Sequence, residues 1–344
     1  MKAWSSAFAL AAVLAGTAAF AADDPSAPRK NVINLQVEND YFAHWANSDE
    51  HYSSGLRASY AWQDCRLCAD RDLAATIASW DPFLAGLRLD TERWFSVSVG
   101  QSIFTPKDVE RRDLIRNDRP YAGWLYVGGS ATYQYSSPNG NTALQNTFAF
   151  EAGVVGPAAG AKQVQNKFHH IIGSDESFGW HNQLRNEPGF NLIAERRYRT
   201  EQVSFFGLEA DVIPRLGASV GNVMTYGAAG GILRIGQRLK NDFGPPQIRP
   251  SLPGSELFQA REFGWYVFIG GDGQAVGRNI FLDGNTFRDS PSVEKKNFVV
   301  EAQGGIAVLL PAARVGMTFV FRSPDFEGIN RWDEFGAITF SFAF

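Results

Sequence analysis

An amide and an imidazole, the side chains of Gln165 and His169, stand four residues apart in the sequence. On a helix, residues at this spacing share one face. A neutral histidine there can take a proton from water, and a nearby amide or carboxylate can orient it. The chain has only 5 histidines, and a histidine in a loop is by default solvated. The pair therefore predicts hydrolytic chemistry only if other reactive groups meet it.

Further polar groups of different chemistry are scattered along the chain. Asn39 and Asp40 offer an amide and a carboxylate, which are hard oxygen ligands. Ser53 offers a hydroxyl, Arg119 a guanidinium and Lys167 an ammonium group. Polar loops are common in any protein, but this variety on a single rim would make a plausible active site.

The element that must position these groups is a β-strand. Apolar and polar residues alternate in 33–38, 95–99 and 338–344, which places successive side chains on opposite faces. Alternating segments of about ten residues over a whole chain are typical of a transmembrane β-barrel, although a water-soluble β-sandwich alternates too. The length of the strands and the aromatic C-terminal strand ending in Phe344 favour the barrel. So do aromatic residues at strand ends, interpreted as a girdle at the membrane interface: Trp94, Trp124, Tyr126, Trp265 and Tyr266.

We predict an all-β fold, an antiparallel transmembrane barrel of about twelve strands with short helices in the connecting segments. The predicted strands are residues 31–40, 53–62, 93–105, 121–136, 142–156, 189–200, 203–215, 224–238, 262–281, 297–310, 312–323 and 333–344. Helices are expected at 70–82 and within 160–186, from apolar residues at helical spacing. If both ends of the chain are periplasmic, all the polar groups named above fall on the cell-exterior rim.

Composition excludes several other classes. The 32 Lys and Arg residues against 36 Asp and Glu give no basic excess, so we expect no nucleic acid partner. With 27 Phe, 10 Tyr and 9 Trp, the chain is far too aromatic to be disordered. Residues 1–21 read as a signal peptide, with Lys2 before an apolar run that is too short to span a bilayer. Residues 22–344 are then one barrel domain.

Two further motifs are weak. Cys65 and Cys68 are the only cysteines, and in an exported chain they suit a local disulfide, a redox pair or half of a metal site. Residues 217–221 match the G-x-S-x-G pattern around Ser219. That nucleophile motif requires a strand, a tight turn and a helix, whereas a glycine-rich strand pattern follows here. We interpret the match as chance.

Several motifs, taken together and in order, carry a resemblance to a known family. They are Val37-Glu38-Asn39-Asp40, Tyr52-Ser53-Ser54-Gly55-Leu56, Asp118-Arg119-Pro120-Tyr121-Ala122-Gly123-Trp124, Val164-Gln165-Asn166-Lys167-Phe168-His169-His170-Ile171-Ile172-Gly173 and the ending in Phe344. This combination resembles the outer-membrane lipid A 3′-O-deacylase family over essentially the whole mature chain. The resemblance implies a twelve-stranded barrel in the bacterial outer membrane. It also implies calcium-dependent removal of the 3′-linked acyloxyacyl chain of lipid A, in a site between the barrel wall and a loop helix near the outer leaflet.

The resemblance also implies roles for individual residues. Gln165 and His169 match the family's glutamine and catalytic histidine, and Asp175 is the nearest candidate for its acidic residue. Asn39 and Asp40 match its Asn-Asp pair, expected here to bind calcium. Three residues are expected to bind the substrate, lipid A or lipopolysaccharide, and the last two of them would pair with its phosphates: Ser53, which falls where the family often has threonine, Arg119 and Lys167.

Two alternatives remain open at this stage, and in each case the chain is expected to be a monomer among outer-membrane lipids. One is a serine phospholipase-type esterase that uses Ser219 or Ser53. The other is a non-enzymatic structural or porin-like barrel, although twelve strands with interior side chains leave little open lumen.

Overall fold

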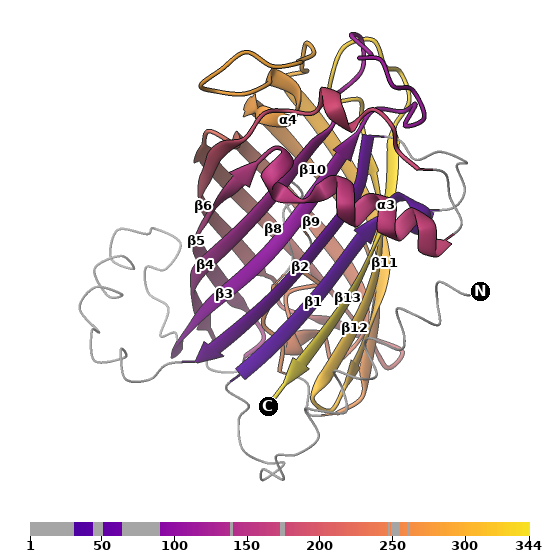
Figure 1. Cartoon of the computed structure of the whole chain (residues 1–344). Helices are drawn as coiled ribbons and strands as arrows, with labels where there is room; N and C mark the ends of the chain where they lie inside the picture. Colours follow the sequence, from indigo (N-terminus) through magenta and orange to yellow (C-terminus); the bar gives the residue numbers. More distant parts are fainter. Residues whose placement is uncertain are drawn as a thin grey trace.

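The computed structural model describes residues 31–43, 51–63, 90–137, 140–172, 176–246, 248, 255–259 and 262–344. Within these residues, twelve antiparallel strands form a closed barrel wall (Figure 1). The wall strands are β1 (Asn31–Asn39), β2 (His51–Gln63), β3 (Asp90–Thr105), β4 (Ala122–Ser136), β5 (Ala143–Val155), β6 (Glu187–Arg199), β8 (Leu208–Gly221), β9 (Met224–Gln237), β10 (Gly264–Asn279), β11 (Phe298–Leu310), β12 (Ala313–Arg322) and β13 (Asp333–Ala343). Each pairs with its neighbour in sequence, and β1 pairs with β13. The predicted fold class is confirmed.

The alternation of the sequence sets the two faces of the wall. In β1, Asn34, Gln36 and Glu38 are buried inside the barrel, while Ile33 and Leu35 lie on the outer face between them. The outer face elsewhere exposes large apolar side chains, such as Val97 of β3 and Val127 of β4. An apolar exterior around a polar interior is the inside-out arrangement that a membrane-spanning barrel requires.

One predicted strand, 203–215, is wrong in detail. Its first residues form a short strand, β7 (Val203–Phe205), which folds back on β8. The turn between them is Phe206-Gly207, and both residues have positive φ, 47° and 79°. A two-residue hairpin turn of this kind matches the twist of the flanking strands. Strand β8 then runs on to Gly221 and closes the barrel against β6.

The predicted aromatic girdle is also wrong for four of its five members. Trp94, Trp124, Tyr126 and Tyr266 are buried inside the barrel, because each shares the inward parity of its strand. Only Trp265 lies on the outward parity of β10. Aromatic rings do gather on the outer wall near the end where β1 begins, and their ring centroids are 5.7–6.4 Å apart: Tyr60, Trp62, Phe95 and Phe344.

Helices lie in the connections. They are α3 (Ala161–Ile172) and α4 (Ile280–Asp283), with 3-10 turns η1 (Asp40–Ala43), η3 (Pro157–Ala159), η4 (Trp180–Asn182) and η5 (Leu239–Asn241). Both α3 and α4 lie at the end of the barrel opposite Phe344 (Figure 1), hereafter the helix end. Helix α3 is shorter than the predicted 160–186 segment. The predicted helix at 70–82, the signal peptide and Cys65 with Cys68 lie outside the described residues. None of the described helices is long and apolar enough to cross a membrane.

The segment between β9 and β10 folds into the barrel. Asp242 is fully enclosed there, and its carboxylate accepts hydrogen bonds from Arg234 at 2.5 Å, Arg314 at 3.1 Å and Tyr266 at 2.8 Å. Buried charges are tolerated when they are paired and hydrogen-bonded in this way. The side chains of this segment thus occupy the interior near the end where the chain of β1 starts.

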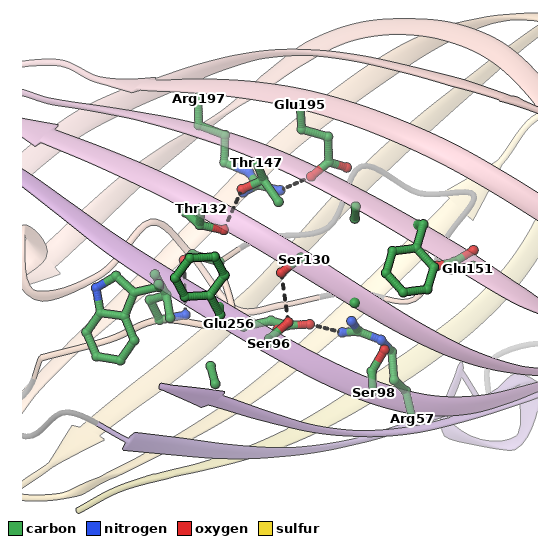
Figure 2. Close-up of a pocket in the computed structure, with 18 of the residues that line it drawn as sticks. Arg57, Ser96, Ser98, Ser130, Thr132, Thr147, Glu151, Glu195, Arg197 and Glu256 are labelled. Carbon is green, nitrogen blue, oxygen red and sulfur yellow. Dashed lines mark hydrogen bonds and ion pairs between the residues drawn. The ribbon is translucent and has the colours of Figure 1, made fainter. Parts of the chain in front are cut away.

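Higher in the interior, the same segment leaves a small polar cavity of about 40 Å³. Figure 2 shows Arg57 paired with Glu256 across this cavity, and Ser96 hydrogen-bonded to Ser130 at 2.7 Å. A space of this size holds about one or two water molecules. The described side chains around this cavity therefore occupy part of the barrel interior.

Candidate active site

Helix α3 lies flat on the outside of the barrel wall, near the helix end (Figure 1). Its sequence has one face that turns toward the wall, with Ala161, Gln165 and His169 buried at helical spacing. Lys162 and Lys167 of the same helix are exposed. The structure thus places Gln165 and His169 on one buried face of one helix, as their spacing predicted.

Three contacts seat the start of α3 on the wall. Gly123 of β4 has no side chain, and a Cβ there would come within 2.5 Å of the Ala161 Cβ. The carbonyl of Gly123 accepts the peptide N–H of Gly156 at 2.9 Å. Gln101 of β3 donates to the Ala159 carbonyl at 2.6 Å. The helix can approach this closely only because position 123 is glycine.

A cavity of about 60 Å³ lies between α3 and the wall. The residues that line it come from β1, η1, β2, β3 and α3. They are Val37, Asn39, Asp40, Ser54, Leu56, Ile103, Val164, Gln165, Phe168 and His169. A carboxylate, two amides, a hydroxyl and an imidazole thus meet in a cavity with otherwise apolar walls. Such a mixture of a base with hydrogen-bonding groups is what hydrolysis of a polar bond in a lipid requires.

Asn39 and Asp40 reach this cavity because β1 ends there. Asn39 is opposite Ser54 of β2 in the strand register, and both face outward. The chain then turns over β13, where Phe42 packs so closely on Gly336 that a Cβ at 336 would lie 2.6 Å from the Phe42 Cβ. This turn places Asp40 beside the cavity.

The amide of Gln165 is held in one orientation. Its Oε1 accepts a hydrogen bond from the indole N–H of Trp180 at 2.9 Å. His169, one helical turn further on, is 4% exposed. Trp180 was not predicted as a site residue, because it is 15 positions from Gln165 in sequence and has no spacing relationship to it.

The other predicted site residues are placed differently. Arg119 is buried, and one of its terminal nitrogens donates to both oxygens of Asp325, at 2.8 and 2.7 Å. It does not line the cavity. Lys167 is exposed on α3. Ser53 belongs to β2, at the point where the register with β3 shifts. Its side chain lies outside the described residues, and so does Asp175. The hydroxyl that lines the cavity belongs to the neighbouring Ser54.

Ser219 has no nucleophilic environment. It lies within β8, faces the barrel interior, and its hydroxyl donates to the Met224 carbonyl at 3.1 Å. The strand, tight turn and helix that a nucleophile elbow requires do not occur here. The G-x-S-x-G match is therefore a feature of strand packing.

Comparison with known proteins agrees with this architecture. The family model described as "Outer membrane protein LpxR" matches residues 6–344. The chain therefore belongs to the LpxR family. The family identity confirms the predicted integral location in the bacterial outer membrane.

A solved structure gives the same fold. The chain is similar to LpxR from Salmonella typhimurium with a TM-score of 0.69 at 19% identity, covering 91% of this chain and 100% of that one. The β-domain of the Bordetella autotransporter BrkA gives a TM-score of 0.40 at 10% identity, over 92% of this chain and 100% of that one. No curated protein sequence matched.

Proposed function

We propose that this LpxR-family protein hydrolyses the 3′-linked acyloxyacyl ester of lipid A in the outer leaflet, in a calcium-dependent reaction. The observation that carries the proposal is the position of the cavity on the lipid-facing side of the wall, where Gln165 and His169 meet Asn39 and Asp40.

The apolar lining of the cavity supports a lipid substrate. Val37, Leu56 and Ile103 have the outward parity of β1, β2 and β3. These rows continue down the wall as residues that face membrane hydrocarbon. An acyl chain anchored in the outer leaflet can therefore reach the cavity from within the membrane plane, without leaving an apolar environment.

The chemistry follows from His169. Its neutral imidazole takes a proton from water as the water oxygen attacks the ester carbonyl carbon. The tetrahedral intermediate collapses, the bond to the sugar oxygen breaks, and the imidazolium returns the proton to that oxygen. The products are the free acyloxyacyl carboxylic acid and a 3′-hydroxyl on the sugar. General base catalysis of this kind contributes on the order of 100-fold or more in rate.

The donor set suits calcium. The carboxylate of Asp40, the amide oxygen of Asn39 and the hydroxyl of Ser54 line one cavity, and calcium prefers hard oxygen ligands. The described part of the chain contains no group of three or more His, Cys, Asp or Glu side chains that could hold a metal ion, so carbonyl groups and water would complete the coordination. Calcium bound there would polarise the ester carbonyl.

Predicted roles for the remaining residues are part of the proposal. The exposed ammonium of Lys167 is available to pair with a phosphate of lipid A. Arg119 is already neutralised by Asp325, so a phosphate would compete with that carboxylate. Ser53 and Asp175 keep their predicted roles in substrate binding and in orienting His169. We expect the protein to act as a monomer.

The test uses purified protein in detergent with lipid A, with and without calcium, followed by mass spectrometry of the lipid. We expect the wild type to release the acyloxyacyl chain only with calcium, and His169→Ala to release none. His170→Ala is the matched control, because His170 is exposed on the other face of the same helix, and it should retain activity. Unchanged deacylation by His169→Ala would overturn the proposal.

A further inference from the structure

The Gln165 amide has two ends, and the structure distinguishes them. Its oxygen accepts the hydrogen bond from Trp180, and both side chains are almost fully enclosed, at 4% and 1% exposed. Its nitrogen, Nε2, is buried and has no hydrogen-bond partner among the described residues. Leaving a buried N–H donor unsatisfied costs about 1–3 kcal/mol. A group that is costly to leave unpaired, on a residue that lines the cavity, points to an acceptor supplied by a ligand.

Trp180 fixes which end of the amide faces it. An indole N–H donates and cannot accept. If the amide were flipped, two donors would face each other and the hydrogen bond would be lost. Therefore the oxygen must stay with Trp180, and the NH₂ group must stay turned away from it.

Trp180 is itself held rigidly. Its ring packs on Tyr121 with centroids 4.8 Å apart, and both belong to a buried cluster with Ile103 and Ala161. The Tyr121 hydroxyl donates to the Val109 carbonyl at 3.0 Å. Burial raises the pKa of Tyr121 far above its ordinary value, so this donor stays protonated. The indole therefore presents its N–H from a fixed position.

We infer that Trp180 is a positioning residue that commits the NH₂ group of Gln165 to donate a hydrogen bond to the ester carbonyl oxygen as it becomes an oxyanion. The inference rests on the proposed function. It gives Gln165 a role different from orienting His169, because its donor end has no hydrogen-bond partner among the described residues. The acceptor class is the carbonyl oxygen of a carboxylic ester, whose negative charge in the transition state strengthens the hydrogen bond.

Trp180→Phe tests this, since phenylalanine keeps an aromatic ring, although a smaller one, and lacks the N–H donor. We expect kcat to fall about 10-fold with little change in KM, because the hydrogen bond it organises acts mainly in the transition state. Trp124→Phe is the matched control. Trp124 is also buried and stacked on a tyrosine, Tyr126, with ring centroids 5.6 Å apart, but inside the barrel. The Trp124→Phe variant should leave kcat unchanged.

Two variants of Gln165 separate the roles. Gln165→Glu keeps an acceptor for Trp180 but loses the NH₂ donor, and we expect it to lose about 100-fold in kcat, as Gln165→Ala does. In the Gln165→Ala background, Trp180→Phe should have little further effect. An equal loss in both backgrounds, or near wild-type activity in Gln165→Glu, would overturn the inference.

A second readout does not depend on activity. By NMR, the indole N–H of Trp180 should exchange slowly with solvent in the wild type and faster in Gln165→Ala, because its acceptor is gone. Equal exchange in the two proteins would contradict the hydrogen bond. A further outcome is that the wild type and Gln165→Ala differ in exchange as expected while the wild type releases no acyl chain. In that case the proposed function fails, and the hydrogen bond between Trp180 and Gln165 stands.

Discussion

The peptide N–H of Ile248 donates to the carboxylate of Glu38 at 2.6 Å, although 210 positions separate the two residues. Glu38 lies on the inner face of β1, directly before Asn39. The segment that fills the barrel is thus attached to the strand whose outer end carries the candidate calcium ligands.

Loss of this acceptor should destabilise the barrel. We expect Glu38→Ala to lower the free energy of unfolding by about 1–3 kcal/mol, because the Ile248 N–H is left buried and unpaired. Glu38→Gln should cost less, since its amide oxygen still accepts. Denaturant unfolding in detergent measures both, with Glu327→Ala as the control because Glu327 is exposed. Equal stability of Glu38→Ala and Glu327→Ala would contradict this expectation.

The seat of α3 at Gly123 gives a second prediction. Gly123→Val should abolish deacylation, because its side chain displaces Ala161 and with it the helix that carries Gln165 and His169. Gly273→Val is the control, since a Cβ at this outward strand glycine meets nothing within 4 Å. Both proteins should still fold, as judged by far-UV circular dichroism. Full activity in Gly123→Val would show that the helix contact is dispensable.

The ion pair between Arg119 and Asp325 gives a third prediction. Arg119→Ala should lower the free energy of unfolding by about 3–5 kcal/mol, because the buried carboxylate of Asp325 loses the guanidinium that hydrogen-bonds both of its oxygens. Removing both charges, in Arg119→Ala with Asp325→Ala, should recover part of that loss. Arg238→Ala is the comparison, since its pair with Glu262 is more than half exposed, and should cost less than about 1 kcal/mol. If Arg119→Ala changes KM but not stability, phosphate binding is its main role instead.

A substitution at the proposed calcium site gives a fourth prediction. Asp40→Asn should raise the calcium concentration needed for half-maximal deacylation, because a carboxylate oxygen binds calcium more strongly than an amide oxygen. Activity should return in excess calcium. The exposed Asp289→Asn serves as control. A calcium response identical to that of the wild type would exclude Asp40 as a ligand.

Much of this molecule is determined locally. A period of two places Asn34, Gln36 and Glu38 on one face of β1, and a period of 3.6 places Gln165 and His169 on one face of α3. Both relationships depend only on neighbouring backbone geometry, and both are readable from the sequence. The exception at 203–207 arises because the apolar pattern does not reveal a two-residue turn with positive φ.

Contacts between residues that are far apart in the chain do not follow from these local patterns. The sequence by itself determined the strands, the amphipathic helix and the family, because these follow from periodicity and motif order. Only the tertiary structure brought Trp180 to Gln165 and paired Arg119 with Asp325. The physical reason is that strand register and loop packing determine these partners among residues far apart in the chain. The local periodicity of the sequence contains no information about either.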